Sequence, residues 1–333
     1  MAELRQDPIT REWVNVAPER GRRPSDFARA TSDAPDESSN ECPFCPGHEH
    51  ASEATLYRFP VDEHMPWSVR VVPNKFPAFS GKGAPIRHKH GMYRSVPAVG
   101  AHEVVIETAQ HNVKPADLSK KQLLLVLQAY RARYLAIRKD VRIRYVLIFG
   151  NHGAAAGASI RHAHSQIIGT PVLPQYARAK IEGVAAYEAK LGRCVYCDIV
   201  EQELDEGERI VNANASFISF APYASRHAFE TWIVPLRRNA HFVEADEREL
   251  ADLAAIFKDT LLRLDRALGD PPYNFVLLTT DVTQQFHWHI EIVPRLHVAA
   301  GFELGTRIFI NSIAPETAAA ELRQVDLSHS TAA

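Results

Sequence analysis

The sequence has few cysteines, no long apolar run and no excess of either charge. Four cysteines occur among 333 residues, and 38 Lys and Arg against 40 Asp and Glu give a formal net charge of −2. This balance lacks the basic footprint by which proteins hold nucleic acid or an anionic membrane. The opening stretch MAELRQDPITREW has no apolar signal-peptide core, and no later run is as long as a membrane span. We therefore expect a cytoplasmic protein with small-molecule partners, and with neither nucleic acid nor a membrane as a partner.

The four cysteines form two pairs with one spacing, Cys42 with Cys45 and Cys194 with Cys197. Two cysteines separated by two residues supply half of a tetrahedral zinc site. A redox pair is the competing interpretation, but such motifs usually lie near a strand–helix–strand pattern, which neither pair opens. The spacing therefore favours zinc as a cofactor.

The chain repeats one order of elements after each cysteine pair. The first copy is predicted to contain a strand, a helix, a strand and a histidine-bearing strand, at residues 102–111, 122–137, 144–151 and 159–167. A capping box of Ser119 and Gln122 is expected at the start of its helix. The second copy has the same order at residues 227–235, 247–268, 273–281 and 286–294. Because this recurrence indicates an internal duplication, we predict an α+β fold of two tandem domains, each an antiparallel sheet packed with helices, at residues 1–180 and 181–333.

The stretch SIRHAHSQI places His162, His164 and Gln166 at every second position. In a strand these side chains project from one face, while their small or apolar neighbours face the other way. His287 and His289 repeat the histidine spacing in the second copy. A polar row on one face is unusual for a core and marks a candidate site.

Histidines further along the first copy are candidates to complete its metal site. They are His111 and His162, with His48 and His50 as nearby alternatives. His111, taken alone, is equally consistent with an ordinary hydrogen-bonded ring. The predicted first site is the set Cys42, Cys45, His111 and His162.

The internal repeat tests the second site, whose candidate ligands are Cys194, Cys197 and His287. His111 lies eight residues after Glu103, and the position eight residues after the matching Glu230 is Arg238. A guanidinium stays protonated and cannot bind zinc. The second site is therefore predicted to be degenerate, having lost this ligand or replaced it with His241.

The loop FGNHGAAAGAS, which precedes the histidine strand, is rich in glycine and alanine. Such a loop lets backbone N–H groups approach phosphate oxygens, and Asn151 and Ser159 add side-chain donors, although an ordinary turn is the alternative. If His162 binds metal, His164 keeps a free ring nitrogen that can attack phosphorus and form a covalent intermediate. Gln166 can then hydrogen-bond the phosphoryl oxygens. The competing interpretation makes both histidines ligands of a catalytic zinc that activates water.

Seven motifs occur in order between about residue 7 and about residue 325, namely DPITREWVNVAPERGRRP, CPFC, PNKFP, GNHGAAAGASIRHAHSQ, FETWIVP, FHWHIEIVPRL and GFELGT. Together they resemble the galactose-1-phosphate uridylyltransferase family of the histidine-triad superfamily. The resemblance implies two histidine-triad-like domains per chain and a homodimer with active sites near the subunit interface. It also implies transfer of a nucleoside monophosphate between sugar phosphates through a uridylyl-histidine.

The resemblance assigns roles residue by residue. It makes His164 the nucleophile and Gln166 its phosphate-binding partner, and it matches the first metal set to the family's zinc ligands. Its phosphate loop corresponds to Asn151, Gly157 and Ser159. Its diphosphate-binding arginines correspond to Arg20 and Arg23, although a solvated basic turn is the commoner role of such a run. The base is expected at Asn74 and Phe76, and the hexose phosphate at Phe302 and Glu303.

This chain departs from the family pattern at three places. Its His-Ala-His-Ser-Gln motif stands where uridylyltransferases commonly have His-Pro-His-Gly-Gln, and is similar to that of relatives that transfer adenylyl groups to phosphate. Lys75 stands where several uridylyltransferases have an aspartate beside the base. Arg238 stands where relatives with a second zinc have a histidine.

These observations support three hypotheses. The first is a ping-pong transferase that moves UMP from UDP-glucose, a nucleotide sugar, to a hexose 1-phosphate such as galactose 1-phosphate. The second keeps the histidine chemistry but takes an ADP-sugar or a dinucleoside polyphosphate as donor and phosphate as acceptor. The third is a zinc-stabilised nucleotide-binding protein without turnover.

Overall fold

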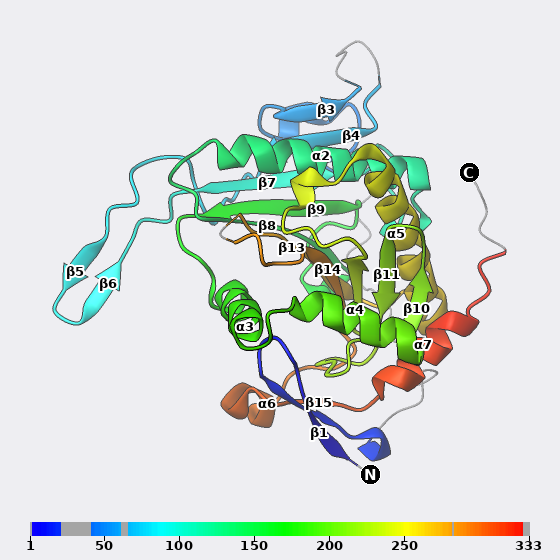
Figure 1. Cartoon of the computed structure of the whole chain (residues 1–333). Helices are drawn as coiled ribbons and strands as arrows, with labels where there is room; N and C mark the ends of the chain where they lie inside the picture. The colour runs from blue at the N-terminus through cyan, green and yellow to red at the C-terminus, as the bar shows by residue number, and fades with distance from the viewer. Residues whose placement is uncertain (1, 21–40, 61–65, 282, 329–333) are drawn as a thin grey trace.

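The main feature of the fold is a ten-stranded antiparallel sheet with two long helices, α2 (Lys120–Arg138) and α5 (Glu247–Leu268), across one face (Figure 1). The computed structural model describes residues 2–20, 41–60, 66–281 and 283–328. The first half contributes β3 (Tyr57–Phe59), β4 (Val69–Pro73), β7 (Ala101–Ile106), β8 (Tyr145–His152) and β9 (His164–Thr170). The second half contributes β10 (Ile210–Ala213), β11 (Phe217–Phe220), β12 (Thr231–Pro235), β13 (Tyr273–Leu278) and β14 (His289–Pro294).

The strand order is mirrored about the middle of the sheet. It runs β10-β11-β12-β14-β13-β8-β9-β7-β4-β3, so each half presents its fourth, fifth, third, second and first strand from the centre outward. Strands β8 and β13 pair antiparallel, with Asn151 opposite Asn274, and thereby join the two predicted sheets into one. The α+β prediction is confirmed, and a mirrored order is what an internal duplication produces. The predicted boundary at residue 180 falls inside α3 (Gln175–Leu191) and stays a prediction.

Local signals explain where the two long helices begin and end. Ser119 caps α2 by accepting the N–H of Gln122, but the Gln122 side chain donates to Ser68 and Glu107, so only half of the predicted capping box forms. Helix α5 has a complete capping box and ends where Gly269 takes up the left-handed conformation. Leucines of both helices lie in one apolar core that spans the two halves.

Several predicted strands are shorter than expected, and both histidine strands begin late. β7 stops at Ile106 and β12 starts only at Thr231. Phe229 has a φ of 61°, and this left-handed backbone separates the preceding residues from the strand. β9 begins at His164, so His162 lies just before the strand instead of within it.

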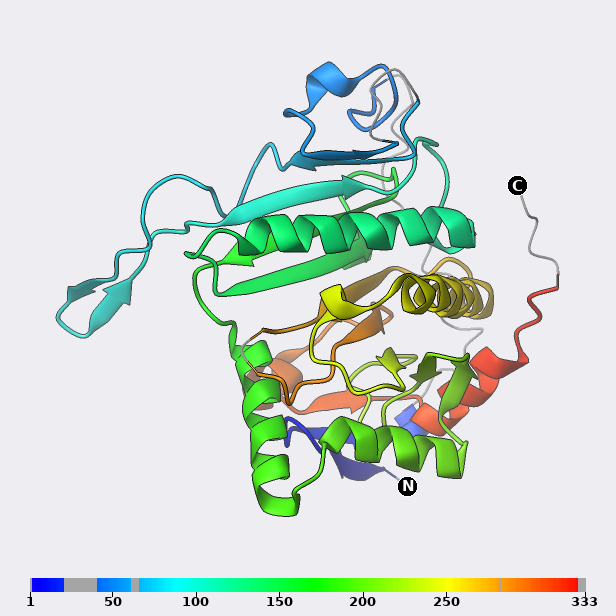
Figure 2. The same ribbon diagram turned by 45° about the horizontal axis from the view of Figure 1, so that its top comes forward.

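Smaller elements surround the sheet. β1 (Glu3–Gln6) and β2 (Trp13–Val16) pair antiparallel, and β15 (Phe309–Asn311) adds parallel to β2. The hairpin of β5 (His88–His90) and β6 (Tyr93–Ser95) projects away from the body (Figures 1 and 2). The other helices are α3, α4 (Val195–Glu206), α6 (Gly301–Thr306) and α7 (Pro315–Gln324), with 3-10 turns at Pro18–Arg20, Glu49–Ala51, Pro115–Asp117, Ala154–Ala156 and Phe242–Glu244. Across the described ranges, no helix combines the length and the apolar character that crossing a bilayer requires.

Candidate active site

The four predicted ligands of the first metal site come together beside the start of β9. The four ligand atoms lie within 4.8 Å of one another, and Cys45 Sγ is 3.3 Å from His111 Nδ1 and 3.7 Å from His162 Nδ1. Zinc bonds of about 2.3 Å to sulfur and about 2.0 Å to nitrogen separate these atoms by about 3.5 Å in a tetrahedral site. His162 donates its Nε2–H to the carbonyl oxygen of Thr108, 2.7 Å away, and so turns an unprotonated Nδ1 toward Cys42 and Cys45. This donor set fits zinc.

The charge states of the first site also suit a metal. Burial lowers the pKa of His162 to about 4, so its ring is neutral at physiological pH, as a metal ligand must be. Burial, reinforced by neighbouring Cys42, raises the pKa of Cys45 to about 11. A thiol with so high a pKa becomes a thiolate when a cation binds to its sulfur.

The second cluster contains three ligands, whose ligand atoms again lie within 4.8 Å of one another: Cys194, Cys197 and His287. The His287 ring repeats the first-site arrangement, because Nε2 lies 2.8 Å from the carbonyl oxygen of Arg237. Its Nδ1 is buried and has no hydrogen-bond partner within the described part of the chain. The structure does not bring His241 to this cluster, since its Nε2 contacts Gln284 at 2.8 Å. His241 therefore does not supply the expected fourth ligand in this structure.

Strand pairing in the sheet gives an independent assignment of the residue that stands where His111 stands in the first site. Val104 in β7 pairs with Gln166 in β9, and Trp232 in β12 pairs with Glu291 in β14, which is the counterpart of Gln166. Val104 and Trp232 are therefore equivalent positions. Carried forward along the chain, this register gives Asn239 as the counterpart of His111, where the sequence count gave Arg238. The carbonyl groups of Thr108 and Arg237, which hold the His162 and His287 rings, instead give Ala240, which has no ligand atom. Neither an amide nor a guanidinium is an imidazole or a thiolate, so the site stays incomplete within the described residues.

One ring nitrogen of His164 makes no hydrogen bond to any of the residues that the structure describes. It is the first residue of β9, and its Nδ1 lies 2.8 Å from the carbonyl oxygen of His162. Nδ1 must donate its hydrogen to that oxygen, which leaves the lone pair on Nε2. Burial lowers the pKa of His164, a shift that the hydrogen bond partly opposes, so the ring is neutral at physiological pH. No described residue makes a hydrogen bond to Nε2, so this nitrogen has the state that a nucleophile needs.

The predicted phosphate loop lies beside His164. A cavity of about 90 Å³ is lined by residues of both, among them Asn151, Gly153, Ala158, His162 and His164. Gly157 has a φ of 88°, a left-handed conformation that side chains other than glycine rarely adopt, and it is exposed. Ser159 is exposed on the same loop.

The second half of the chain supports this loop. Asn274 in β13 donates from Nδ2 to Asn151 Oδ1 and to the carbonyl oxygen of Ala156, both at 2.8 Å. Its position in a strand of ordinary composition gave no sequence signal for this role. The contact became visible only once β8 and β13 were seen to pair.

Gln166 is the next residue of β9 on the face of His164, and it contacts a residue that the sequence analysis missed. Its Oε1 lies 2.7 Å from Nε2 of His102, in the neighbouring strand β7. Asn74, expected near the base, also contacts His102, with Nδ2 3.1 Å from Nε2. His102 thus joins two predicted binding residues that are distant in the sequence.

Other predicted binding residues do not reach His164 through any described contact. Phe76 is 84% exposed, follows Asn74 in the loop after β4 and has its backbone N–H bound by Asn74. Arg20 is exposed in a turn after β2, and Arg23 lies outside the described residues. Phe302 and Glu303 belong to α6, which packs on β15 in the other half of the molecule, and Glu303 caps that helix.

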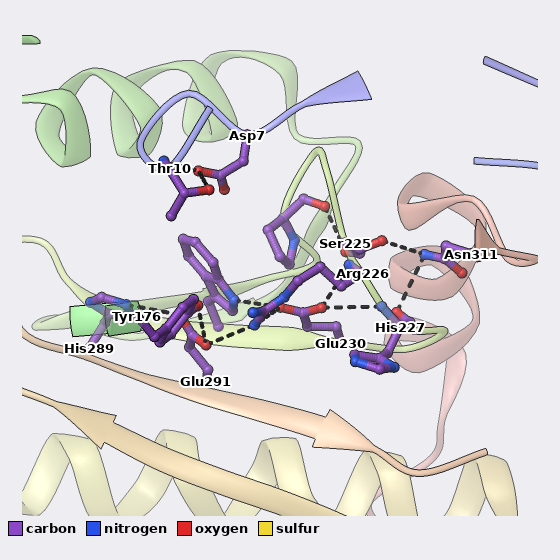
Figure 3. A network of polar contacts seen from close by, with 12 residues as sticks. Asp7, Thr10, Tyr176, Ser225, Arg226, His227, Glu230, His289, Glu291 and Asn311 are labelled. Carbon is purple, nitrogen blue, oxygen red and sulfur yellow. Dashed lines mark hydrogen bonds and ion pairs between the residues drawn. The ribbon is translucent and has the colours of Figure 1, made fainter. Parts of the chain in front are cut away.

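The site equivalent to His164 in the second half is filled by a buried polar network (Figure 3). His289 has its Nδ1 2.8 Å from the carbonyl oxygen of His287, but its Nε2 lies 3.0 Å from Lys180 Nζ. Lys180 also forms an ion pair with Glu291 at 2.5 Å, and Arg226 lies 3.1 Å from the same carboxylate. Tyr176 donates to Glu291 as well. The second histidine motif is therefore closed by protein groups.

Another cavity, of about 540 Å³, lies beside α4 and is lined by residues of the second half together with Gln6, Asp7 and Pro8. Its polar lining includes Glu203 and Glu206, which are paired with Arg209, and Asp198, which accepts from Tyr187. It contains none of the histidines. The smaller cavity is the candidate active site because it contains the free Nε2 and the glycine-rich loop.

Comparison with known proteins agrees with this geometry. Residues 1–174 match the family model described as galactose-1-phosphate uridyl transferase, N-terminal domain, and residues 99–328 match a domain of unknown function. An ADP-glucose phosphorylase of Arabidopsis thaliana is 34% identical over 335 residues, covering 98% of this chain and 93% of the relative. A galactose-1-phosphate uridylyltransferase of Thermotoga maritima is 28% identical, covering 98% of this chain and 99% of the relative.

Solved structures give the same result. The crystal structure of ADP-glucose phosphorylase from Arabidopsis thaliana with bound ADP-glucose aligns with a TM-score of 0.83 at 32% identity, covering 98% of this chain and all of that one. A uridylyltransferase structure aligns with a TM-score of 0.76 at 31% identity, covering 97% of each chain. The chain belongs to the galactose-1-phosphate uridylyltransferase family of the histidine-triad superfamily.

Proposed function

We propose that this protein moves a nucleoside monophosphate from a nucleotide sugar to a second phosphate-bearing acceptor through a covalent nucleotidyl-His164. The observation that carries the proposal is the state of the His164 ring, which is neutral, tethered through Nδ1 and open at Nε2 beside a glycine-rich loop. Histidine in this state is a competent nucleophile toward phosphorus. A nucleotide-binding protein without turnover would not require such a ring.

Each step of the proposed reaction uses side chains and backbone groups near His164. Backbone N–H groups of the loop and the amides of Asn151 and Gln166 hold the phosphoryl oxygens, where they stabilise the charge that develops during transfer. His164 Nε2 forms a bond to the α-phosphorus, and the bond to the leaving sugar phosphate breaks. The acceptor's phosphate oxygen then attacks the same phosphorus and releases His164 unchanged.

The role that we propose for the metal cluster is structural, not catalytic. Zinc bound there would hold His162, whose carbonyl oxygen fixes the His164 ring at 2.8 Å. The family relationship and the four-ligand donor set support zinc as the structural cofactor. The three-ligand second cluster is weaker support for a second ion.

The two candidate donors are ADP-glucose and UDP-glucose, and ADP-glucose has the stronger support. The His-Ala-His-Ser-Gln motif is similar to that of adenylyl-transferring relatives, and Lys75 departs from the aspartate that several uridylyltransferases have beside the base. The 34% identical relative is an ADP-glucose phosphorylase. We therefore propose ADP-glucose as donor and phosphate as acceptor. UDP-glucose with a hexose 1-phosphate is the second candidate, supported by the family model and the uridylyltransferase relatives.

A homodimer would complete the site. Phe302 and Glu303, which the family resemblance assigns to the hexose phosphate, lie on α6 and are not among the residues that line the His164 cavity. A second subunit that presents its α6 to this cavity would supply them. Size measurement by light scattering tests the dimer, and a monomer that is fully active would contradict it.

Intact-protein mass spectrometry after brief incubation with ADP-glucose, and separately with UDP-glucose, tests the function. We expect an adenylyl increment that peptide mapping places on His164. A uridylyl increment alone would select the second candidate. No increment from either donor, in protein that binds both, would contradict the covalent mechanism.

A further inference from the structure

His102 carries no role in the proposed reaction, yet it lies between two of its binding residues. It is half-buried in β7 and sits diagonally across the sheet from Gln166, on the face that also bears His164. Three groups contact its ring. They are the N–H of Ala78 at 3.1 Å from Nδ1, Gln166 Oε1 at 2.7 Å from Nε2, and Asn74 Nδ2 at 3.1 Å from Nε2.

The backbone N–H of Ala78 fixes the proton on this ring. An N–H group can only donate, so Nδ1 of His102 must accept and cannot carry hydrogen. A neutral imidazole carries its one hydrogen on the other nitrogen, and Nε2 must therefore donate. The acceptor within reach is Gln166 Oε1, 2.7 Å away. The Asn74 Nδ2 group, 3.1 Å away, is itself a donor because Asn74 Oδ1 accepts from Phe76, so it makes no hydrogen bond to a protonated Nε2.

This proton in turn fixes the amide of Gln166. With Oε1 held by His102, the Gln166 NH₂ group points away from β7. Within the described residues, no hydrogen-bond partner meets that NH₂ group. An amide in the opposite orientation would present its oxygen to the incoming phosphoryl group and repel it. The direction of a single hydrogen on His102 thus decides whether Gln166 is a donor or an acceptor at the site.

We infer that His102 is a positioning residue that orients the Gln166 amide for phosphoryl binding, and that the loop carrying Asn74 and Ala78 controls this orientation. Ala78 lies four residues after Asn74, directly after the PNKFP segment that is expected to hold the base. Seating the nucleotide base would therefore lock the Ala78 N–H, the His102 tautomer and the Gln166 amide in sequence. This inference rests on the proposed function and adds a coupling between base recognition and phosphoryl transfer.

Two substitutions of His102 separate its two hydrogen bonds. In His102→Gln the longer amide reaches the place of Nε2 and can still donate to Gln166. In His102→Asn the shorter amide reaches the place of Nδ1 and can still accept from Ala78 but cannot reach Gln166. The two variants are matched in chemistry and differ in which contact survives.

We expect His102→Asn to lower the rate of nucleotidyl-His164 formation about 10- to 100-fold, the range typical of residues that orient binding groups, with a smaller change in KM. His102→Gln should retain most of the rate. In a Gln166→Ala background both substitutions should have little further effect, because the group that they act through is gone. Melting temperatures confirm that the variants fold. Equal rates in the two variants, or additive losses in the Gln166→Ala background, would overturn the inference.

Nitrogen NMR of the His102 ring gives a readout that does not depend on turnover. The wild-type protein should show a neutral ring with hydrogen on Nε2, assigned by its loss in His102→Gln. Hydrogen on Nδ1 would overturn the inference even if His164 is nucleotidylated. If wild-type protein forms no adduct with ADP-glucose or UDP-glucose, the proposed function fails, and the affinity for ADP then decides: an affinity lower in His102→Asn than in His102→Gln supports the inference, and equal affinities overturn it.

Discussion

The two halves of this chain build the same histidine motif and leave it in opposite states. In each, the second histidine of the motif has Nδ1 2.8 Å from the carbonyl oxygen of the first, and an aromatic residue of the cysteine motif packs beside it. In the first half, Nε2 of His164 makes no hydrogen bond to any described residue. In the second half Nε2 of His289 meets Lys180 at 3.0 Å.

The difference comes from what covers the sheet. Helix α3 supplies Tyr176 and Lys180 to the face that carries His289. A glutamate, Glu291, stands where the first half has Gln166, and its buried carboxylate needs the cations that fill the space. The motif alone therefore does not make a nucleophile. The groups around Nε2 of the second histidine decide whether that nitrogen is free to act as a nucleophile.

The largest expected effect comes from substituting His164, compared with substituting His289. His164→Gly should lower nucleotidyl transfer by about 10⁴-fold or more, because the covalent route is lost. His289→Gln should leave the rate close to that of the wild type. Rates with ADP-glucose and UDP-glucose check both. If the two variants lost activity equally, the assignment of chemistry to the first half would be wrong.

The two cysteine clusters should differ in metal content. Cys45→Ser removes one of four ligands in the first half and should release zinc and lower the melting temperature strongly. Cys197→Ser acts on a three-ligand set and should change the total zinc much less. Elemental analysis of purified protein measures the difference. Equal zinc loss from both variants would show that the second cluster binds as firmly as the first.

The Lys180–Glu291 pair should affect stability, whereas Gln166 should affect activity. Glu291→Gln leaves Lys180 buried without its carboxylate and should cost about 3–5 kcal/mol of unfolding free energy. Gln166→Ala, at the equivalent half-buried place, should lower the transfer rate instead. Denaturant unfolding and kinetics on both variants check the contrast. A stable, fully folded Glu291→Gln protein would contradict the described network.

Glu291 also predicts a pH dependence. Burial raises its pKa, but Lys180, His289 and Arg226 outweigh burial and hold it well below the usual value. The stability that the ionised carboxylate supplies is therefore complete above its unfolded pKa, about 4.3, and is lost as pH falls through the lower folded pKa. The difference in unfolding free energy between wild type and Glu291→Gln should be constant from pH 7 to pH 5 and shrink below pH 4. A difference that grows on acidification would reverse this sign.

The smallest effect is expected on the opposite face of the sheet. The Tyr130 hydroxyl in α2 lies 2.9 Å from Glu107 Oε1 and 2.6 Å from Ser165 Oγ, directly behind the active strand. Tyr130→Phe leaves these buried groups with one partner fewer and should cost about 1–3 kcal/mol. Thermal unfolding measures it. The transfer rate should stay within a few-fold of wild type, and a large loss would show that β9 depends on this support.

Some features could be predicted because they are local or periodic. The helix at Glu247–Leu268 follows from its 3.6-residue pattern, and the first metal set follows from ligand chemistry and spacing. The place of His241 could not be predicted, because Gln284, which contacts its ring, is distant in sequence. His102 was missed because a diagonal neighbour is undefined until the register of β7 against β9 is known.

The sequence by itself determined the family, the repeated order of elements and the residues able to bind metal or attack phosphorus. These depend on residue type and short spacing, which the chain carries directly. The tertiary structure alone decided that the two sheets join through β8 and β13 and that Lys180 closes His289. It also decided that His102 holds Gln166. Such contacts join residues far apart in the chain, and the packing of many weakly constrained side chains selects among them, so no local pattern encodes them.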